Sequence, residues 1–506
     1  MMEKQRSLGM QIDGLFEGLA VVTDDRSVVG LTEDSRAVVP GMLFLACRGS
    51  AGHGLDHLDE AIERGAVAVA WEPVSGVVAP EVAEPVLVFP VDELRNKAGV
   101  IAGRFYGDPS AVLEVAGVTG TNGKTTCTWL IAQGLEKSGR AGGLIGTLGT
   151  GRPGAMQAGT HTTPSPIVLQ QELAAFRDSG VRNVAMEVSS HALDQRRIAG
   201  VRVPVAAFTN LTREHLDYHG DIHSYRMAKA RLFQGPGLEH AIVNADDPFG
   251  SELIGQIDPH IEVCSISVQS GTPATGTRHL QIVGIEPRPS GLDVTLRNGS
   301  ETQTFATRLI GQFNAYNVAI AVAVLLHWGL NSDDIAELFR DIEGPPGRMQ
   351  AIGGGADLPL VLIDYAHTPD ALANALKAVR THCHGALWCV FGCGGNRDAG
   401  KRPEMGAIAV ELANRVIVTD DNPRDEDPDQ IIADVLRGMP DNAAQVERNR
   451  SKAIRDTIEA ADAGDIVLIA GKGDEEIQLI GSEKRWFSDA DEARRALAQR
   501  QTEDLS

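Results

Sequence analysis

A glycine-rich stretch at residues 117–126, Gly-Val-Thr-Gly-Thr-Asn-Gly-Lys-Thr-Thr, contains the kinds of residue that bind phosphate. Gly120 and Gly123 allow backbone N–H groups to turn toward an anion, and the positive end of a following helix adds to the attraction. We expect Lys124 to reach the β- and γ-phosphates of a nucleotide, and a hydroxyl of the Thr-Thr pair to hold Mg²⁺.

The order of elements around this loop is more informative than its spacing. An apolar, β-branched run precedes the glycines, and a helical pattern follows the Lys-Thr pair. The spacing departs from the usual G-x-x-x-x-G-K-T loop, because Val118 stands where the first glycine is expected. The alternative interpretation is a plain glycine turn before a helix. The complete order favours a phosphate site, and leaves open whether water, a hydroxyl or a carboxylate receives the phosphate.

The acidic composition restricts the partners. The chain has 506 residues and a formal net charge of −22, so it has no general electrostatic attraction for nucleic acid or an anionic membrane. No segment approaches the ~18 consecutive apolar residues of a membrane-spanning helix, and residues 1–20 lack the apolar core of a signal peptide. We expect a soluble, cytoplasmic, monomeric protein with small-molecule ligands, without nucleic-acid binding or membrane insertion.

The patterns that must position these residues predict an α/β protein. The first segment has short apolar runs between turns, the second carries the glycine loop, and a Gly/Pro-rich linker near residues 341–355 precedes the third. Near-continuous apolar runs in the second segment are typical of parallel strands buried on both faces. Strand and helix patterns alternate in the third segment, which predicts a doubly wound sheet. We place the segments at residues 1–112, 113–345 and 346–506.

Four polar or Gly-rich loops of the third segment each follow an apolar strand pattern. Parallel sheets of this type bind ligands at the carboxyl ends of their strands, so these loops should lie along one edge. They are Asp364–Thr368, Gly394–Asp398, Asp420–Arg424 and Gly471–Glu475.

Together with the glycine loop, further blocks resemble the Mur ligase family, ATP-dependent amide-forming enzymes of peptidoglycan synthesis. The resemblance spans nearly the whole chain in order, and implies a UDP-sugar-binding α/β domain, a central P-loop ATPase-like parallel sheet and a Rossmann-like amino-acid-binding domain. The related folylpolyglutamate synthetases begin close to the P-loop, whereas this chain has more than a hundred residues before it. The blocks are MEVSSHAL (186–193), NLTREHLDYHG (210–220), AKARLF (228–233), NADD (244–247), GQFNAYN (311–317), GPPGRMQ (344–350), DYAHTPDAL (364–372) and GKRPEMG (400–406).

The resemblance implies ATP as co-substrate, Mg²⁺, and a set of residues around them. The ATP site would comprise Gly120, Thr121, Asn122, Gly123, Lys124, Thr125, Thr126, Asn317, Arg348 and Asp364. The metal would be held by Thr125, Glu187, His215 and Lys229, and the catalytic residues would be Lys124, Glu187, His215 and Lys229.

Lys229 has an unusual role in this set. The matching lysine of the family carries a carbamate derived from CO₂, and a carbamate can bind Mg²⁺ whereas a bare ammonium would repel it. From the residues alone, Lys229 would be interpreted as an exposed helix lysine.

The muramyl-peptide substrate of the family would be held by residues of the first two segments. Ser35 and Arg36 match a uridine-nucleotide loop at residues 34–54, for which a surface turn is an equally good interpretation from composition alone. The set implied for UDP-MurNAc-dipeptide is Ser35, Arg36, Thr162, Thr163, Ser189, Gln195 and Arg197.

The stretch Asp-Asn-Pro-Arg at residues 421–424 resembles the diaminopimelate-adding branch of the family, and a solvated acidic turn is the alternative. Diaminopimelate has a carboxylate at its far end, which lysine lacks, and a guanidinium such as that of Arg424 binds a carboxylate through two hydrogen bonds. Asp474 and Asn396 depart from the family pattern, which usually has His and Asp there. The implied amino-acid site is Arg397, Asp421, Asn422, Pro423, Arg424, Gly471 and Glu475.

The reaction that the resemblance implies explains why ATP is needed. The γ-phosphoryl group would move to the carboxylate of UDP-MurNAc-L-Ala-D-Glu, and the amine of meso-diaminopimelate would then displace phosphate from the acyl phosphate. Two anions must meet, so catalysis would consist mainly of charge neutralisation and alignment. The alternatives are a ligase of the same fold that adds lysine or a folate glutamate, and a P-loop ATPase of another class.

Overall fold

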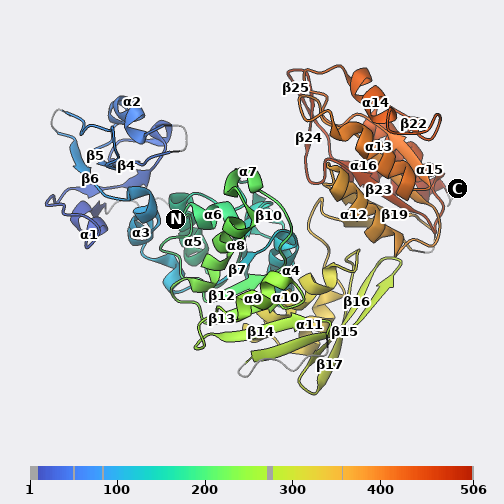
Figure 1. The fold of residues 1–506 in the computed structure, drawn as a ribbon, viewed down its shortest axis with the longest axis horizontal. Coiled ribbons are helices and arrows are strands. Elements are labelled where there is room, and N and C mark those ends of the chain that lie inside the picture. Colours follow the sequence, from blue (N-terminus) through green and yellow to red (C-terminus); the bar gives the residue numbers. More distant parts are fainter. Residues whose placement is uncertain (1–8, 50–51, 83–84, 270–276, 356, 504–506) are drawn as a thin grey trace. The chain divides into compact units, whose positions relative to one another are not determined.

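The computed structural model describes residues 9–49, 52–82, 85–269, 277–355 and 357–503. The chain forms two compact units, residues 1–124 with 139–264, and residues 125–138 with 265–506 (Figure 1). Residues 50 and 51 of the predicted uridine-nucleotide loop, and residues 1–8 of the amino-terminal stretch, lie outside the described residues.

The first unit begins with a small parallel sheet in the order β3-β4-β5-β6. Its central strands come from the predicted apolar runs, and every residue of β5 is buried. Helix α3 packs its Leu94, Ala98 and Ile101 into the core on one face of this sheet. The elements are β1 (Met10–Gln11), α1 (Ile12–Phe16), β2 (Ser27–Val28), β3 (Gly30–Thr32), β4 (Met42–Ala46), α2 (Leu58–Glu63), β5 (Ala68–Trp71), β6 (Leu87–Pro90) and α3 (Leu94–Phe105).

A second sheet of the first unit carries the P-loop, with strands in the order β10-β9-β8-β11-β7-β12-β13-β14. Strands β8, β11, β7, β12 and β13 are parallel, and β9 and β10 form an antiparallel edge. All four residues of β12 are buried, as the near-continuous apolar run predicted. The strands are β7 (Glu114–Thr119), β8 (Gly142–Gly146), β9 (Gly149–Arg152), β10 (Ala155–Gln157), β11 (Asn183–Glu187), β12 (Val205–Phe208), β13 (His240–Asn244) and β14 (Glu262–Ser267).

The helices of this part of the first unit follow the parallel strands. Helix α5 contributes Leu169, Leu173 and Phe176 to a core that it shares with Val184 and Met186 of β11. The helices are α5 (Pro166–Asp178), α6 (Ser190–Asp194), α7 (Leu216–His219), α8 (Ile222–Ala230) and α9 (Pro248–Ile254), and η4 (Arg231–Gln234) is a 3₁₀ turn.

The second unit contains helix packing and three antiparallel strands that the sequence did not predict. Helix α4 starts at Lys124 and packs closely on the buried helix α10, because Gly134 leaves room for the side chain of Leu325. The strands β15, β16 and β17 are joined by antiparallel pairing. The elements are α4 (Lys124–Lys137), β15 (Thr277–Arg288), β16 (Gly291–Asn298), β17 (Glu301–Thr307), α10 (Asn314–His327) and α11 (Ser332–Phe339).

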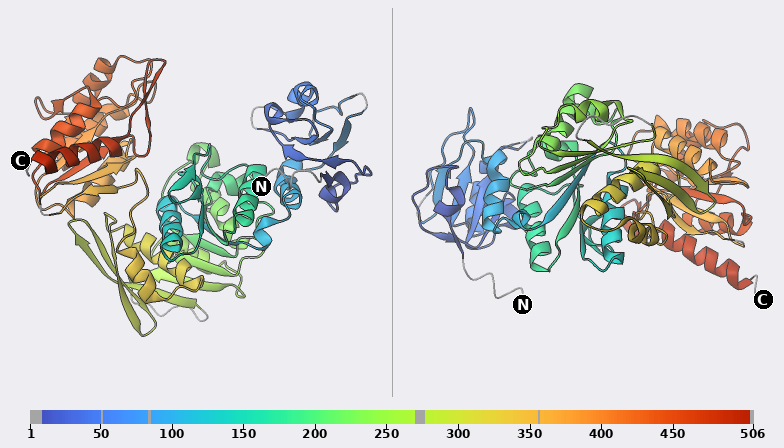
Figure 2. Two further views of the ribbon diagram at one scale, coloured as in Figure 1. Left: turned by 180° about the vertical axis from the view of Figure 1, so that it is seen from behind. Right: turned by 90° about the horizontal axis from the view of Figure 1, so that it is seen from below.

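The C-terminal sheet of the second unit has the order β18-β19-β23-β20-β21-β22. Helices α12, α13 and α14 cover one face and α15 and α16 the other, so the predicted doubly wound arrangement is confirmed (Figure 2). The elements are β18 (Gln350–Gly353), β19 (Leu360–Asp364), α12 (Pro369–Arg380), β20 (Leu387–Phe391), α13 (Lys401–Leu412), β21 (Arg415–Val418), α14 (Pro428–Leu436), β22 (Gln445–Val446), α15 (Arg450–Ala460), β23 (Ile466–Ala470), the hairpin β24 (Ile477–Ile480) and β25 (Glu483–Trp486), and α16 (Asp489–Glu503).

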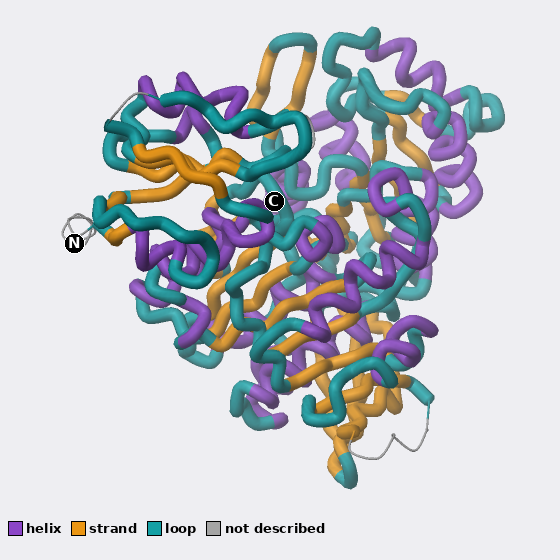
Figure 3. The backbone as a smooth tube through the Cα atoms, turned by 60° about the vertical axis from the view of Figure 1, so that its left-hand side comes forward, coloured by secondary structure: helices purple, strands orange, loops and turns teal. Residues whose placement is uncertain are grey.

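The four predicted ligand-binding loops follow four adjacent parallel strands of this sheet. Strands β19, β23, β20 and β21 are neighbours in that order, so their carboxyl ends meet at one edge. Figure 3 shows helices and strands throughout the described backbone, as expected for an α/β protein. No helix among the described residues combines the length and apolarity required to cross a membrane. The α/β fold class is confirmed, and the segment boundaries at 112 and 345 remain a prediction.

A buried ion pair between Arg450 and Asp489 contacts the end of β23, next to the ligand-binding edge. The guanidinium of Arg450, 2% exposed, makes two 2.7 Å hydrogen bonds to the carboxylate of Asp489, which is fully buried. Its Nη2 also donates to the backbone oxygen of Ala470, the last residue of β23. The pair therefore ties α15 and α16 to the strand end that precedes the Gly471 loop.

We expect Asp489→Ala to lower the free energy of unfolding by about 3–5 kcal/mol, because it leaves a buried guanidinium without its counter-ion. Urea denaturation measures this change. The control is Glu483→Ala, which breaks an exposed ion pair with Arg485 and should leave the free energy of unfolding almost unchanged. Equal losses in the two variants would contradict the assignment of Arg450 and Asp489 as a buried support.

Candidate functional site

The P-loop has the backbone geometry that its glycines suggested. Gly120 has φ +148°, and a Cβ on it would collide with the hydroxyl of Thr209, so only glycine fits there. Gly123 has φ +87°, in the region that L side chains avoid. The backbone N–H of Asn122 donates to Asn210 at 3.0 Å, which holds the loop against the segment after β12.

Two lysines of this loop region share one carbonyl. The Nζ of Lys124 donates to the backbone oxygen of Gly120 at 2.8 Å, and the Nζ of Lys229 donates to the same oxygen at 2.7 Å. Lys229 is 1% exposed, which contradicts the interpretation from residues alone as an exposed helix lysine. Burial, and then the nearby charge of Lys124, lower the pKa of Lys229 well below its usual value.

Tyr225 lies between Lys229, the P-loop and His215, and it was not among the residues predicted from the sequence. The Lys229 Nζ lies 4.5 Å from the centre of the Tyr225 ring, and the Tyr225 hydroxyl lies 3.1 Å from that of Thr121. The ring of His215 lies 6.3 Å from the same ring. Burial raises the pKa of Tyr225 to about 12, so it keeps its proton. Its position one helical turn before Lys229 is the signal that could have identified it.

His215 belongs to an aromatic cluster at the start of α7. It has φ +54°, and its ring packs edge-to-face on His191 with centroids 4.8 Å apart. His191 also contacts the rings of Tyr218 and His219. The structure therefore brings His215, Lys229 and the P-loop into one neighbourhood, as the resemblance implied.

Glu187 lies at the carboxyl end of β11, paired in register with Val118 of the strand that enters the P-loop. Its carboxylate is 1% exposed and accepts the backbone N–H of Thr147 at 2.8 Å and its hydroxyl at 3.3 Å. Among the described residues, no group of three or more His, Cys, Asp or Glu side chains could hold a metal by itself. The predicted ligands Thr125 and Glu187 offer one hydroxyl and one carboxylate. This is a typical set for Mg²⁺, which completes its coordination shell with water and phosphate oxygens.

Five of the seven residues predicted for the muramyl-peptide, Thr162, Thr163, Ser189, Gln195 and Arg197, form a hydrogen-bonded group beside Glu187. The Thr163 hydroxyl donates to the backbone oxygen of Glu187, and Arg197 donates to the backbone oxygen of Thr163, both at 2.8 Å. Arg197 also makes two hydrogen bonds to the Gln195 side chain, at 2.7 and 3.0 Å. The Ser189 hydroxyl caps helix α6, and Thr162 lies 3.1 Å from Thr147 through their hydroxyls.

Ser35 and Arg36 do not join this group through their own side chains. The hydroxyl of Ser35 is buried against the Glu60 carboxylate at 2.6 Å, and exposed Arg36 pairs with Asp34. Glu33, which directly precedes this loop, is close enough to Arg197 for the charge of the guanidinium to act on its carboxylate. Burial raises the pKa of Glu33, and its hydrogen bond to Cys47 and the charges of two arginines, one of them Arg197, partly offset this.

In the second unit, the predicted ATP contacts fall into two places. Arg348 stacks on the ring of Tyr365 at 4.4 Å, next to Asp364 at the end of β19. Burial raises the pKa of Asp364, while N–H groups of Met349 and Ala366 donate to its carboxylate at 2.8 and 3.0 Å. Asn317 lies elsewhere, buried in α10 against Cys127 of α4, and its amide donates to Asn314.

All seven residues predicted for the amino-acid substrate meet at the loop edge of the C-terminal sheet. Arg424 donates to the backbone oxygen of Gly395 at 2.9 Å, and a Cβ on Gly394 would touch both Arg424 and Arg397. The guanidinium of Arg397 is exposed and has no side-chain partner in the described parts of the chain. The set is Arg397, Asp421, Asn422, Pro423, Arg424, Gly471 and Glu475.

Lys472 holds Asn422 and Glu475 together at the same loop edge, and it was not among the residues predicted from the sequence. Its ammonium is fully buried and donates to Asn422 at 3.2 Å, to Glu475 at 3.1 Å and to the backbone oxygen of Ile477 at 2.7 Å. Asn422 in turn donates to Glu475 at 2.8 Å. Burial raises the pKa of the neighbouring Asp421, and the charges of Arg450 and Lys472 oppose the shift.

The two departures from the family pattern have local structural roles. Asn396 has φ +53°, a conformation that asparagine tolerates better than most residues, and its side chain accepts the N–H of Asp425 at 3.2 Å. Asp474 lies against Gly347, where any Cβ would collide with the backbone of Asp474. Burial raises the pKa of Asp474, and the charge of Arg348 partly offsets this.

A P-loop on a parallel sheet, followed by a doubly wound sheet with arginine-lined loops at its carboxyl edge, defines a P-loop α/β protein suited to a nucleotide and a second anionic ligand. The model of the Mur ligase middle domain matches residues 118–325, that of the Mur ligase glutamate ligase domain matches residues 347–473, and that of the Mur ligase family catalytic domain matches residues 27–106.

Curated relatives match almost the full length. A UDP-N-acetylmuramoyl-L-alanyl-D-glutamate–2,6-diaminopimelate ligase from Alkalilimnicola ehrlichii is 47% identical, over 94% of this chain and 96% of its own. The ligase of the same name from Pseudomonas putida is 46% identical, over 97% of this chain and 98% of its own. The chain therefore belongs to the Mur ligase family.

Solved structures agree with this assignment. A structure titled as a UDP-N-acetylmuramoyl-L-alanyl-D-glutamate–2,6-diaminopimelate ligase has a TM-score of 0.74 at 33% identity, covering 98% of this chain and 100% of that chain. A folylpolyglutamate synthase from Mycobacterium tuberculosis has a TM-score of 0.58 at 18% identity and covers 74% of this chain and 92% of its own, which shows a likeness of fold.

We expect Gly120→Ala to weaken nucleotide binding at least about tenfold, because the added Cβ pushes the loop away from Thr209 and misdirects its N–H groups. Calorimetric titration with ATP measures the change. The matched control is Gly180→Ala, a glycine with φ +85° and open space around its Cβ, which should bind ATP like the unmodified protein. Equal weakening in both variants would show that backbone strain alone, rather than the P-loop collision, is responsible.

Proposed function

We propose that this protein is an ATP-dependent, ADP-forming amide ligase that adds meso-diaminopimelate to UDP-MurNAc-L-Ala-D-Glu in peptidoglycan precursor synthesis. The observation that carries the substrate assignment is the edge where Arg397 and Arg424 flank Gly394 and Glu475 faces them across Asn422. The near full-length relatives with diaminopimelate ligase names support the same reaction.

The amino-acid edge has a charge pattern that fits diaminopimelate better than lysine. Two guanidinium groups can bind a terminal carboxylate, and each charge-assisted pair with good geometry adds specificity. The Glu475 carboxylate, 39% exposed, remains accessible to an ammonium while Lys472 and Asn422 hold its Oε2. Lysine offers this site no second carboxylate, so the arginines would stay without an anionic partner.

ATP would be held by the P-loop residues 120–126, with Asn317, Arg348 and Asp364 as further contacts. Lys124, whose ammonium donates to the backbone oxygens of Gly120 and Thr121, would meet the β- and γ-phosphates. We assign Mg²⁺ to the oxygen donors Thr125 and Glu187, with His215 as a further ligand; the ion would neutralise phosphate charge when bound.

Lys229 fits the carbamate that the resemblance implied. Its buried amine has a lowered pKa, so the neutral form that reacts with CO₂ is favoured, and the reaction would replace this amine with a carbamate anion. Tyr225 and the Gly120 carbonyl would orient the nitrogen.

The reaction then consists of two displacements. A carboxylate oxygen of UDP-MurNAc-L-Ala-D-Glu attacks the γ-phosphorus and ADP leaves, and the diaminopimelate amine attacks the acyl carbon and phosphate leaves with loss of a proton. Thr162, Thr163, Ser189, Gln195 and Arg197 would hold the peptide end of the acceptor, and Ser35 and Arg36 its uridine end. The chain's own contribution is alignment and fixed positive charge.

We further propose three domains with boundaries near residues 112 and 345, a cytoplasmic location and a monomeric state. The three family-model matches, 27–106, 118–325 and 347–473, support the boundaries. No nucleic-acid or membrane partner is part of the proposal.

One assay tests the proposed reaction. Phosphate release from ATP should require both UDP-MurNAc-L-Ala-D-Glu and meso-diaminopimelate, and mass spectrometry should detect the tripeptide product. Release with no acceptor present would favour a P-loop ATPase. Release with lysine at the same rate would favour the lysine-adding alternative.

We expect Arg424→Ala to reduce kcat/KM for diaminopimelate by about 10- to 100-fold, because a charge-assisted hydrogen-bonded pair contributes about 1.5–3 kcal/mol. ATP binding, measured calorimetrically, should be unchanged. The control is Arg485→Ala on the exposed β25 strand, which should keep full activity. An Arg424→Ala enzyme with unchanged kinetics for diaminopimelate would contradict the proposed recognition of the far carboxylate.

We expect Lys472→Met to raise KM for diaminopimelate about tenfold or more, because Asn422 and Glu475 lose the ammonium that positions them. KM for ATP and for the UDP-linked dipeptide should stay within about twofold, which separates positioning from general instability. Lys452→Met, which removes an exposed lysine paired with Glu447 and Asp456, is the control. A parallel rise in all three KM values would contradict the positioning role.

A further inference from the structure

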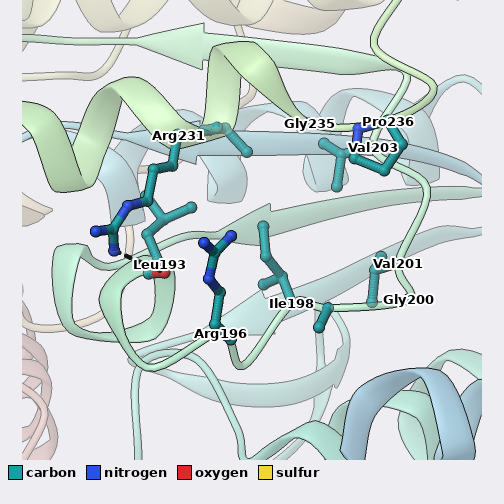
Figure 4. Close-up of a pocket in the computed structure, with 11 residues that line it drawn as sticks. Leu193, Arg196, Ile198, Gly200, Val201, Val203, Arg231, Gly235 and Pro236 are labelled. Atoms are coloured by element: carbon teal, nitrogen blue, oxygen red, sulfur yellow. Dashed lines mark hydrogen bonds between the residues drawn. The ribbon is translucent and has the colours of Figure 1, made fainter. Parts of the chain in front are cut away.

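The first unit has a cavity close to the hydrogen-bonded group predicted for the muramyl-peptide. It is an apolar cavity of about 270 Å³ between the loop after α6 and the η4 turn (Figure 4). Its walls are formed mainly by Ile198, Val201, Val203, Leu232 and Pro236. An apolar cavity does not hold water well, so a ligand with an apolar body is the better occupant.

Two arginines border this apolar cavity. Figure 4 shows the guanidinium groups of Arg196 and Arg231 toward one end, with Val201, Val203 and Pro236 toward the other. Arg231 donates to Asp194 at 2.8 Å, whereas exposed Arg196 has no side-chain hydrogen bond or ion pair within the described ranges of the chain. Arg196 has φ +56°, a conformation that a non-glycine residue adopts at a cost.

We propose that this cavity binds a small amphipathic carboxylate, a molecule of about ten non-hydrogen atoms with an apolar body and one anionic group. The volume equals that of roughly nine water molecules, which suits a benzene ring with a short acid chain. The carboxylate would pair with Arg196, since a guanidinium binds a carboxylate through two hydrogen bonds. The chain has a net charge of −22 and repels anions in general, so an anion can bind here only because the Arg196 guanidinium attracts it locally.

The cavity is connected to the muramyl-peptide group by a chain of hydrogen bonds. Arg231 bonds to Asp194, Asp194 accepts the Tyr218 hydroxyl at 3.0 Å, and Tyr218 accepts the Gln195 amide at 3.1 Å. Gln195 in turn holds Arg197. Arg231 borders the same end of the cavity as Arg196, so a carboxylate bound at Arg196 adds negative charge close to the Arg231–Asp194 pair. Occupancy is therefore expected to change KM for the UDP-linked dipeptide, a consequence that rests on the proposed function.

Calorimetric titration of the full chain with phenylacetate tests the binding directly and needs no catalytic activity. Phenylacetate should bind at millimolar concentration or below, while phenylacetamide, which lacks the charge, and acetate, which lacks the apolar body, should bind at least tenfold more weakly. Absence of phenylacetate binding would overturn the proposal. Equal binding of the amide or of acetate would overturn it as well, because the site would then recognise only one half of the molecule.

Variants locate the site. Arg196→Gln should weaken phenylacetate binding at least tenfold, while Arg182→Gln, an exposed arginine outside the cavity, should not. Ile198→Trp should fill the cavity and abolish binding, and Ile254→Trp, at a similarly half-buried position of the same core, should keep it. Binding that persists in both Arg196→Gln and Ile198→Trp would place the ligand elsewhere and overturn the assignment.

Activity assays test the coupling separately. Phenylacetate should shift KM for the UDP-linked dipeptide at least twofold in the unmodified enzyme and leave it unchanged in Arg196→Gln. If calorimetry shows binding but KM does not move, the binding site stands and the coupling through Asp194 fails. If the enzyme does not use the dipeptide at all, the proposed function fails, and the calorimetric result still decides whether the cavity binds.

Discussion

Burial of the parallel strands on both faces is the constraint on which the sites of this protein depend. Strands such as β12 and β23 have no solvent-facing side, so polar side chains can leave the core only where a strand ends. The P-loop after β7, Glu187 at the end of β11, and the arginine and glutamate loops after β20, β21 and β23 all occupy such ends. The fold therefore concentrates charge at the carboxyl edge of each sheet.

Positive charge at these edges is held by oxygen atoms of the backbone as much as by acidic side chains. Lys124 and Lys229 share the Gly120 carbonyl, Arg424 uses the Gly395 carbonyl, and Lys472 uses that of Ile477. A carbonyl fixes the position of a cation without cancelling its charge. An acidic chain can in this way keep strong local cations for anionic substrates.

The sequence predicted the parallel sheets and their ligand loops because those features leave local signals. Apolar runs mark buried strands, and glycines such as Gly120 mark positions that no Cβ can occupy. The antiparallel strands β15, β16 and β17 were not predicted. Their alternating apolar and polar residues lie in a largely polar stretch that contains no motif. The domain boundaries remain a prediction.

Tyr225 and Lys472 were missed for a different reason. Each acts through contacts with residues that the fold brings together, Tyr225 with Thr121 and Lys472 with Asn422. A lysine in a glycine-rich loop predicts exposure, and only the three-dimensional arrangement shows that Lys472 is fully buried. The departures Asn396 and Asp474 also became intelligible only when their backbone neighbours were known.

The hairpin of β24 and β25 fixes the side chain that we assign to substrate choice. Backbone hydrogen bonds join Arg424 to Leu479 and Gly481, and Arg424 is held in a left-handed conformation between them. The direction of its guanidinium is thus constrained by a short hairpin from which we assign no side chain to substrate binding. Natural insertions or deletions in that hairpin would turn the guanidinium without replacing the arginine, so preference for the incoming amino acid can drift through changes in loop length.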